Sequence, residues 1–83
     1  MARLYILQSQ STRRYYVGST NDLPRRLSEH NREHSPVTRG RGPWKLVYQE
    51  SFATLPEARR RERDIKNWKS AKLIASLIAE AVG

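Results

Sequence analysis

The sequence predicts an α+β fold, a small three-stranded antiparallel sheet flanked by helices, in the order β-β-α-β-α-α. Three short runs rich in aromatic and branched apolar residues are bounded by Ser, Gly and Pro, as is typical of strands. Apolar residues recur at helical spacing in the C-terminal half. Seven polar residues separate the first two runs, and so short a connection favours antiparallel pairing.

The N-terminal part predicts a hairpin followed by a short helix. We expect strands at residues 4–7 and 15–18, joined by a polar loop over residues 8–14. The helix is expected from about Leu23 to His30. Residues 19–22 offer several N-cap candidates, and Pro24 falls in the first turn that follows, where its missing N–H does no harm.

The remaining elements follow from turn residues and periodicity. Two Gly and two Pro predict a loop over residues 34–43. The third strand is expected at residues 44–52, with Leu46, Tyr48 and Glu50 on one of its faces. Thr54 is expected to cap the next helix, with a glutamate at the capping-box position. The apolar side of that helix comprises Leu55, Ala58, Ile65 and Trp68, and that of the last helix, after a break at residues 69–70, comprises Leu73, Ile74, Leu77, Ile78 and Val82.

Charge and composition narrow the range of possible functions. The 83 residues carry 16 Lys and Arg against 8 Asp and Glu, a net charge of +8 that predicts a polyanionic partner. The absence of cysteine excludes a disulfide framework, a thiolate nucleophile and a cysteine-based zinc site. No apolar run approaches the roughly 18 residues of a membrane span. We therefore expect one cytoplasmic domain over residues 1–83 that binds nucleic acid and no membrane.

A carboxylate interrupts the apolar side of the helix that follows Thr54. Glu62 lies four residues after Ala58 and three before Ile65, so it should face the sheet or its rim. One interpretation is an ion pair with an arginine of the same helix. The other is a ligand of a hard cation such as Mg²⁺, which takes one or two carboxylates and keeps its waters for substrate phosphate.

Two further features suggest chemistry on phosphate. Arg26 and His30 share a helix face, where they could grip a phosphate and move a proton or simply form a solvated surface. Tyr15 and Tyr16 must point to opposite faces of the sheet. A tyrosine outside the core and near several arginines would have a lowered pKa, which would allow it to act as a general base.

As an ordered set, these residues resemble the GIY-YIG endonuclease family. Arg3-Leu4-Tyr5 and Tyr16-Val17-Gly18 resemble its two name-giving triplets, with ten residues between the tyrosines. Residues 18–31 are similar to the helix that follows the second triplet. Residues 43–48 and 58–68 resemble the small stand-alone, YhbQ-like members, so the resemblance extends from the first strand to the penultimate helix.

The resemblance implies hydrolysis of DNA phosphodiester bonds with one Mg²⁺ or Mn²⁺ ion. It implies Tyr5 and Tyr16 as active-site tyrosines, Arg26 as the catalytic arginine, His30 as its partner and Glu62 as the metal ligand. It also implies a bacterial-type cytoplasmic protein, associated with the nucleoid when bound to DNA, in DNA repair, recombination or processing. Without a recognition domain, the choice of substrate would come from DNA structure, branched or single-stranded, from a protein partner or from a homodimer.

The other basic residues are expected to contact backbone phosphates, unless they form only a solvated basic face. Such contacts give affinity with little sequence information and with strong salt dependence. The residues expected to make them are Arg13, Arg14, Arg39, Arg41, Arg59, Arg63 and Lys66.

The chain departs from the family pattern at two points. Arg3 stands where the first triplet has glycine, and apolar residues 74–78 stand where many members carry a late asparagine. Asn31 or Asn67 would have to replace that asparagine in space. Two alternatives therefore stay open: a catalytically weak or inactive nucleic-acid-binding module with the same fold, and a basic RNA-associated protein.

Overall fold

The computed structural model describes residues 1–32 and 42–82, and its described elements follow the predicted order. Three antiparallel strands form one sheet in the spatial order β2-β1-β3. The α+β class and the order β-β-α-β-α-α are therefore confirmed. The elements are β1 (Ala2–Ser9), β2 (Tyr15–Thr20), α1 (Leu23–Asn31), β3 (Trp44–Phe52), α2 (Leu55–Asn67) and α3 (Ala71–Val82).

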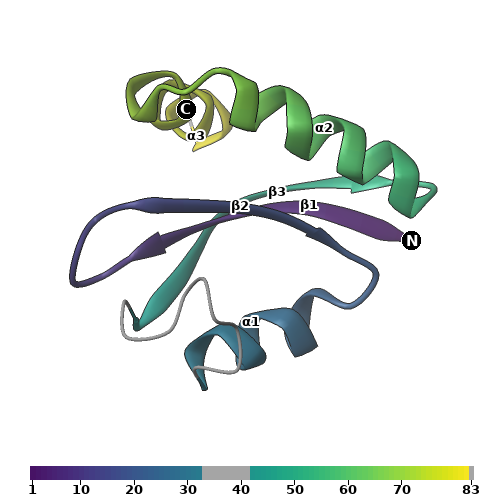
Figure 1. Ribbon diagram of the computed structural model, residues 1–83, viewed down its shortest axis with the longest axis horizontal. Coiled ribbons are helices and arrows are strands. Elements are labelled where there is room, and N and C mark those ends of the chain that lie inside the picture. Colours follow the sequence, from purple (N-terminus) through teal and green to yellow (C-terminus); the bar gives the residue numbers. More distant parts are fainter. Residues whose placement is uncertain (33–41, 83) are drawn as a thin grey trace.

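The sheet separates two small apolar layers. Helix α1 covers one face, whereas α2 and α3 cover the other (Figure 1). Strand β1 lies in the centre and supplies both layers, because successive side chains alternate between the two faces. Leu4 and Ile6 are fully buried on the side of α2 and α3, and Tyr5 and Leu7 are buried on the side of α1.

The first two strands are longer than predicted. β1 extends two residues beyond the apolar run at each end, and β2 continues to Thr20. The added residues are mostly polar, so the apolar pattern gave no sign of them. Backbone pairing carries the strands further: Gln8 lies opposite Tyr15 on one side and Lys45 on the other.

The helix starts depend on side-chain caps. Among the predicted capping residues, Asp22 holds the N-cap of α1 and accepts a hydrogen bond from the Arg25 backbone N–H at 3.2 Å. The Asp22 N–H itself donates to Thr20 Oγ1 at 3.0 Å. Thr54 caps α2 as predicted, and its hydroxyl donates to Glu57 at 2.9 Å.

A β-bulge in β3 changes which side chains share a face of that strand. The register with β1 shifts so that Val47 has no partner, because Ile6 pairs with Tyr48 and Leu7 pairs with Leu46. The bulge interrupts the two-residue alternation. Leu46 therefore packs on the side of α1 and Tyr48 on the side of α2, and the prediction that they share a face is wrong.

Two helices close the second layer. In α2, Ala58 and Ile65 are fully buried against the sheet, as predicted. Arg61 of the same helix binds Glu50 of β3 through Nε and Nη2, at 3.1 to 3.3 Å. This ion pair fixes the rotation of α2 about its axis.

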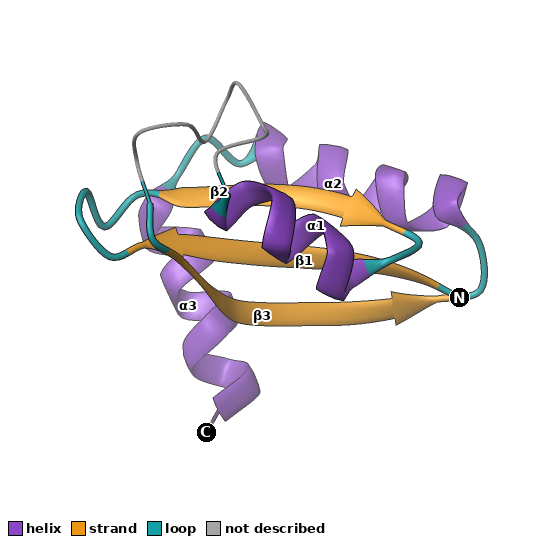
Figure 2. Ribbon diagram, turned by 90° about the horizontal axis from the view of Figure 1, so that it is seen from below, coloured by secondary structure: helices purple, strands orange, loops and turns teal. Residues whose placement is uncertain are grey.

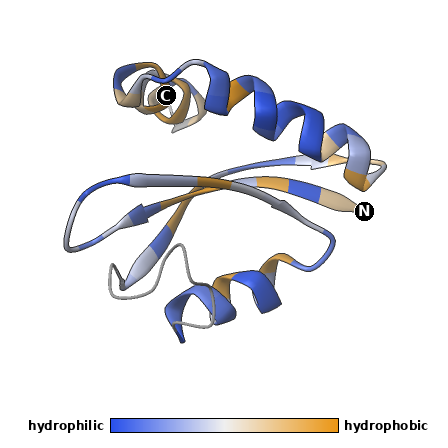
Figure 3. Ribbon diagram, in the orientation of Figure 1, coloured by the Kyte–Doolittle hydropathy of each residue, from blue (hydrophilic) through white to orange (hydrophobic). Residues whose placement is uncertain are grey.

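The third helix is less completely covered. The apolar residues Ile74, Leu77 and Ile78 of α3 pack on the core, but Leu73 is 51% exposed, contrary to the prediction. The side chain of Val82 lies outside the described part. Figure 3 shows this mixed helix beside the largely hydrophilic α2. None of the described helices is long and apolar enough to cross a bilayer.

Candidate active site at the edge of the sheet

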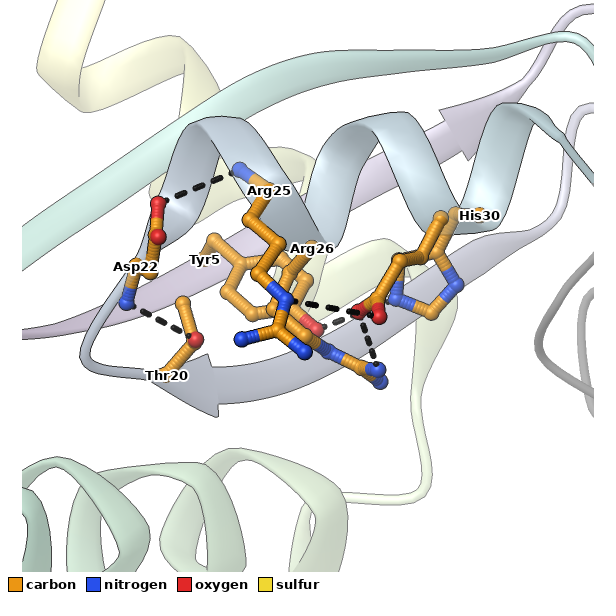
Figure 4. A network of polar contacts seen from close by, with 7 residues as sticks. Tyr5, Thr20, Asp22, Arg25, Arg26 and His30 are labelled. Atoms are coloured by element: carbon orange, nitrogen blue, oxygen red, sulfur yellow. Dashed lines mark hydrogen bonds and ion pairs between the residues drawn. The ribbon is translucent and has the colours of Figure 1, made fainter.

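A buried tyrosine and histidine form the centre of the candidate site. Tyr5 projects from β1 beneath α1, and its hydroxyl oxygen lies 3.1 Å from His30 Nε2 (Figure 4). Both side chains are almost completely buried. Gly18 of β2 lies directly opposite Tyr5, and a Cβ atom on Gly18 would meet the Tyr5 hydroxyl oxygen at 2.5 Å. Glycine is therefore required here for the close approach of the tyrosine ring, not for its backbone conformation.

Burial determines the protonation of this pair. Desolvation raises the pKa of Tyr5 to about 12, although the nearby Arg26 guanidinium lowers it. Desolvation and, second, the positive charge of Arg26 lower the pKa of His30 to about 4. At neutral pH the phenol therefore keeps its proton and the imidazole is uncharged. Tyr5 is buried, so the lowered pKa expected for a tyrosine outside the core does not apply to it.

Arg26 and Tyr16 complete this side of the sheet. The Arg26 guanidinium lies beside the Tyr5 hydroxyl and forms an ion pair with Glu29 at 3.0 Å. The half-buried ring of Tyr16 lies 4.7 Å, centroid to centroid, from that of His30. Tyr15 packs on the opposite face, as strand alternation predicts. The structure thus brings Tyr5, Tyr16, Arg26 and His30 together.

Glu62 reaches the same strand edge from the other face. Ser19 of β2 donates a hydrogen bond to Glu62 Oε1 at 2.5 Å, and Lys66 Nζ lies 2.5 Å from Oε2. The Glu62 side chain is 21% exposed. Its expected position at the rim of the sheet is confirmed. Its ion-pair partner is Lys66, so the interpretation as a pair with an arginine of the helix is wrong.

Two open hollows connect the two halves of the site. One, of about 400 Å³, lies between α1 and α2 and is lined by Ser19, Arg25, Arg26 and Arg59 among others. The other, of about 440 Å³, is lined by Arg59, Glu62, Arg63, Lys66 and Asn67. Arg59 borders both, and Ser19 reaches from the first hollow to the carboxylate of the second. Figure 2 shows β2 as the outer strand at this edge, with α1 in front of the sheet and α2 behind it.

The predicted phosphate-contacting residues divide into three groups. Arg59, Arg63 and Lys66 line the hollow of Glu62. Arg13 and Arg14 are exposed in the turn between β1 and β2, and the structure does not bring them into either hollow. The remaining two, Arg39 and Arg41, lie outside the described residues.

Ser19 and Arg25 belong to the site but were not singled out in the sequence. Ser19 was considered only as a helix cap, although alternation in β2 places it with Val17 on the face of α2. Arg25 lies beside Arg26 in the first turn of α1, and nothing in the sequence pattern distinguishes it from a solvent-exposed arginine. Asn31 cannot serve as the late asparagine, because its amide binds the backbone of Trp44 at 2.6 and 3.1 Å. Asn67 does line the hollow of Glu62.

The donor set limits the kind of metal site that these residues could form. Within residues 1–32 and 42–82, no group of three or more His, Cys, Asp or Glu side chains could share an ion. Glu62 supplies one carboxylate, with the Ser19 hydroxyl beside it. One carboxylate, completed by water and substrate phosphate, is a common environment for Mg²⁺. These residues therefore fit an ion held jointly with the substrate.

Comparison with known proteins agrees with the fold. Residues 1–74 match the family described as GIY-YIG catalytic domain. A UPF0213 protein of Halobacterium salinarum is 41% identical over 73 residues, which cover 87% of this chain and 94% of the relative. One of Clostridium perfringens is 45% identical over 67 residues, 80% of this chain and 71% of the relative. The solution NMR structure of a UPF0213 protein of Bacillus halodurans has a TM-score of 0.60 and 33% identity, and the match covers 95% of this chain and 84% of that chain.

Proposed function

The chain belongs to the GIY-YIG family, as its residues predicted, and we propose that it is a metal-dependent endonuclease that hydrolyses DNA phosphodiester bonds. Its choice of substrate would depend on DNA structure, with branched or single-stranded DNA as the candidates. The proposed place of action is the cytoplasm, on nucleoid DNA, in repair, recombination or processing.

One observation carries the proposal: acid–base groups and the carboxylate of Glu62 lie on the two sides of one strand edge. Tyr5, Arg26 and His30 lie on one face of the sheet, and Glu62 approaches from the other. The two halves are close enough to interact, because the negative charge of Glu62 contributes to the raised pKa of Tyr5. A phosphodiester laid over this edge would contact the partly exposed Arg26 on one side and Glu62 on the other.

Glu62 would hold the one Mg²⁺ or Mn²⁺ ion of the proposed enzyme. Such an ion, when bound, neutralises charge on the phosphate and on the leaving oxygen. Ser19 holds one carboxylate oxygen at 2.5 Å, which fixes the orientation of the group. Arg26 would bind the phosphate from the side of α1, where its interaction strengthens as negative charge develops.

Tyr5 and His30 form the proposed proton path. Tyr5 would take the proton of the attacking water while its own hydroxyl proton moves along the 3.1 Å hydrogen bond to His30 Nε2. Tyr16, against the His30 ring, would help to place that water.

Before substrate binds, proton transfer from Tyr5 to His30 is unfavourable, because the pKa of Tyr5 is high and that of His30 is low. A cation beside Glu62 removes one cause of the first shift. A phosphate beside Arg26 offsets one cause of the second.

The test is Glu62→Gln, with Glu80→Gln on α3 as a matched control that changes an exposed acid. Purified protein is incubated with Mg²⁺ or Mn²⁺ and duplex, flapped, branched and single-stranded DNA. We expect Glu62→Gln to abolish cleavage and to bind DNA as well as or better than the wild type, whereas Glu80→Gln cuts normally. Cleavage by Glu62→Gln at the wild-type rate would exclude the assignment of Glu62.

A second candidate is a nucleic-acid-binding module of the same fold without catalysis. The contact between Lys66 and Glu62 favours it, because an ammonium already neutralises the carboxylate that a metal would need. It predicts tight, salt-dependent binding and no cleavage of any of these DNAs with either metal. Tighter retention of RNA than of DNA, with no effect of metal, would instead favour the RNA-associated protein.

A further inference from the structure

The Lys66 ammonium contacts the carboxylate that would hold the metal. The ammonium lies 2.5 Å from Glu62 Oε2, while Ser19 binds the other oxygen at the same distance. It also lies 5.9 Å from the centre of the Tyr16 ring, which places it over the candidate site. Both oxygens of the carboxylate are thus occupied, one by a neutral donor and one by a positive charge.

The Lys66 ammonium can move away from Glu62 at little cost in stability. The Lys66 side chain is 51% exposed, and the pair is a same-helix contact four residues apart. Half-exposed pairs of this kind contribute little to folding, and lysine carries its charge on a flexible four-carbon stem. By contrast, Ser19 has a short side chain on a strand of the sheet, so its hydroxyl stays near the carboxylate. Oε2 is therefore the oxygen that an incoming cation can most easily take.

We propose that Lys66 is the resident counter-cation of Glu62 and that it transfers to a substrate phosphate when a divalent cation binds that carboxylate. This inference rests on the proposed function, because it assumes the metal at Glu62. It makes Lys66 a positioning residue that couples the two ligands. Without DNA, the ammonium competes with the metal; with DNA, the phosphate gives the ammonium another partner, so each ligand favours the other.

The first experiment measures metal binding without catalysis. Mn²⁺ is titrated by electron paramagnetic resonance into the wild type, Lys66→Met and Lys66→Arg in the absence of DNA. Lys72→Met, which removes an exposed lysine from α3, controls for net charge. We expect Lys66→Met to bind Mn²⁺ at least fivefold more tightly than the wild type. Lys66→Arg and Lys72→Met should stay within twofold of the wild type.

The second experiment measures DNA binding without metal. Affinity for an oligonucleotide is determined in EDTA for the wild type, Glu62→Gln, Lys66→Met and the double variant. We expect Glu62→Gln to bind at least threefold more tightly, because it releases Lys66 to the phosphates, and we expect this gain to vanish when Lys66 is methionine. An equal gain in both backgrounds would mean that Glu62 merely repels DNA, which overturns the exchange.

The outcomes separate this inference from the proposed function. If the wild type cuts DNA but Lys66→Met binds Mn²⁺ no more tightly than Lys72→Met, the exchange is wrong and the nuclease assignment survives. If no variant binds Mn²⁺ with or without DNA, the exchange and the metal at Glu62 fail together. Circular dichroism of each variant excludes misfolding as the cause.

Discussion

Gly18→Ala changes one hydrogen into a methyl group at the point where the two central strands hold the Tyr5 ring. The new Cβ would lie 2.5 Å from the Tyr5 hydroxyl oxygen, 2.6 Å from its Cζ and 3.1 Å from Cε1 of Tyr16. The first two distances are far below ordinary contact, so an atom must move. The Tyr5 side chain would have to move, although its ring is buried and its hydroxyl is hydrogen-bonded to His30.

The geometry sets the size of the effect. Restoring a contact of about 3.5 Å requires the Tyr5 ring to retreat by roughly 1 Å. A shift of this size would strain or break the 3.1 Å hydrogen bond to His30. Overpacking costs about 1–3 kcal/mol, and a buried polar group left without its partner costs a similar amount. We therefore expect the free energy of unfolding to fall by about 1–3 kcal/mol if that bond survives and by up to about 6 kcal/mol if it breaks.

Urea denaturation followed by circular dichroism measures this loss, and Gly42→Ala is the matched control. A Cβ on Gly42 would meet Trp44 Cδ1 at 3.5 Å, an ordinary contact. The same chemical change there should be neutral, or stabilising by up to about 1 kcal/mol, because alanine restricts the unfolded chain. Equal unfolding midpoints for the two variants would refute the argument that Gly18 makes room for Tyr5.

Three further predictions concern stability. The unfolded chain protonates His30 near pH 6.5, whereas the folded protein resists protonation until about pH 4, so stability should fall by up to roughly 3 kcal/mol as pH falls through that window. Urea midpoints between pH 7 and 4 test this, and His30→Gln should flatten the profile. Asn31→Ala removes two hydrogen bonds to the Trp44 backbone and should lower the urea-derived stability by about 1–3 kcal/mol. For the Arg61–Glu50 pair, a double-mutant cycle with Arg61→Met and Glu50→Gln should give a coupling near 1 kcal/mol, and zero coupling would contradict its role in orienting α2.

The sequence predicted the elements wherever one physical signal dominates. Apolar runs located all three strands, and the capping threonine located the start of α2. The sequence also placed Glu62 at the rim of the sheet, because a carboxylate between Ala58 and Ile65 cannot avoid that face. These inferences needed only local periodicity.

The features that the sequence did not predict depend on pairing between distant residues. The bulge at Val47 arises from the register of β3 on β1, which no local pattern encodes. The raised pKa of Tyr5 depends on the depth of its burial beneath α1, whereas the sequence predicted a lowered pKa only for a tyrosine outside the core. The sequence favoured an arginine as the ion-pair partner of Glu62, whereas in the structure the partner is Lys66, four residues further along the same helix.

The pKa shifts of Tyr5 and His30 would keep the site inactive until a metal ion and a substrate phosphate bind. Before substrate binds, the raised pKa of Tyr5 and the lowered pKa of His30 both oppose moving the Tyr5 proton to His30. Burial is the largest cause of both shifts, but Glu62 adds to the first and Arg26 to the second. These two charges are the ones that a cation and a phosphate would neutralise. A Glu62→Gln variant should therefore lower the pKa of Tyr5 even without metal, and ultraviolet titration of tyrosine ionisation, with Tyr5→Phe to identify the signal, would measure it. An unchanged titration would show that the two faces of the sheet are not coupled through Tyr5.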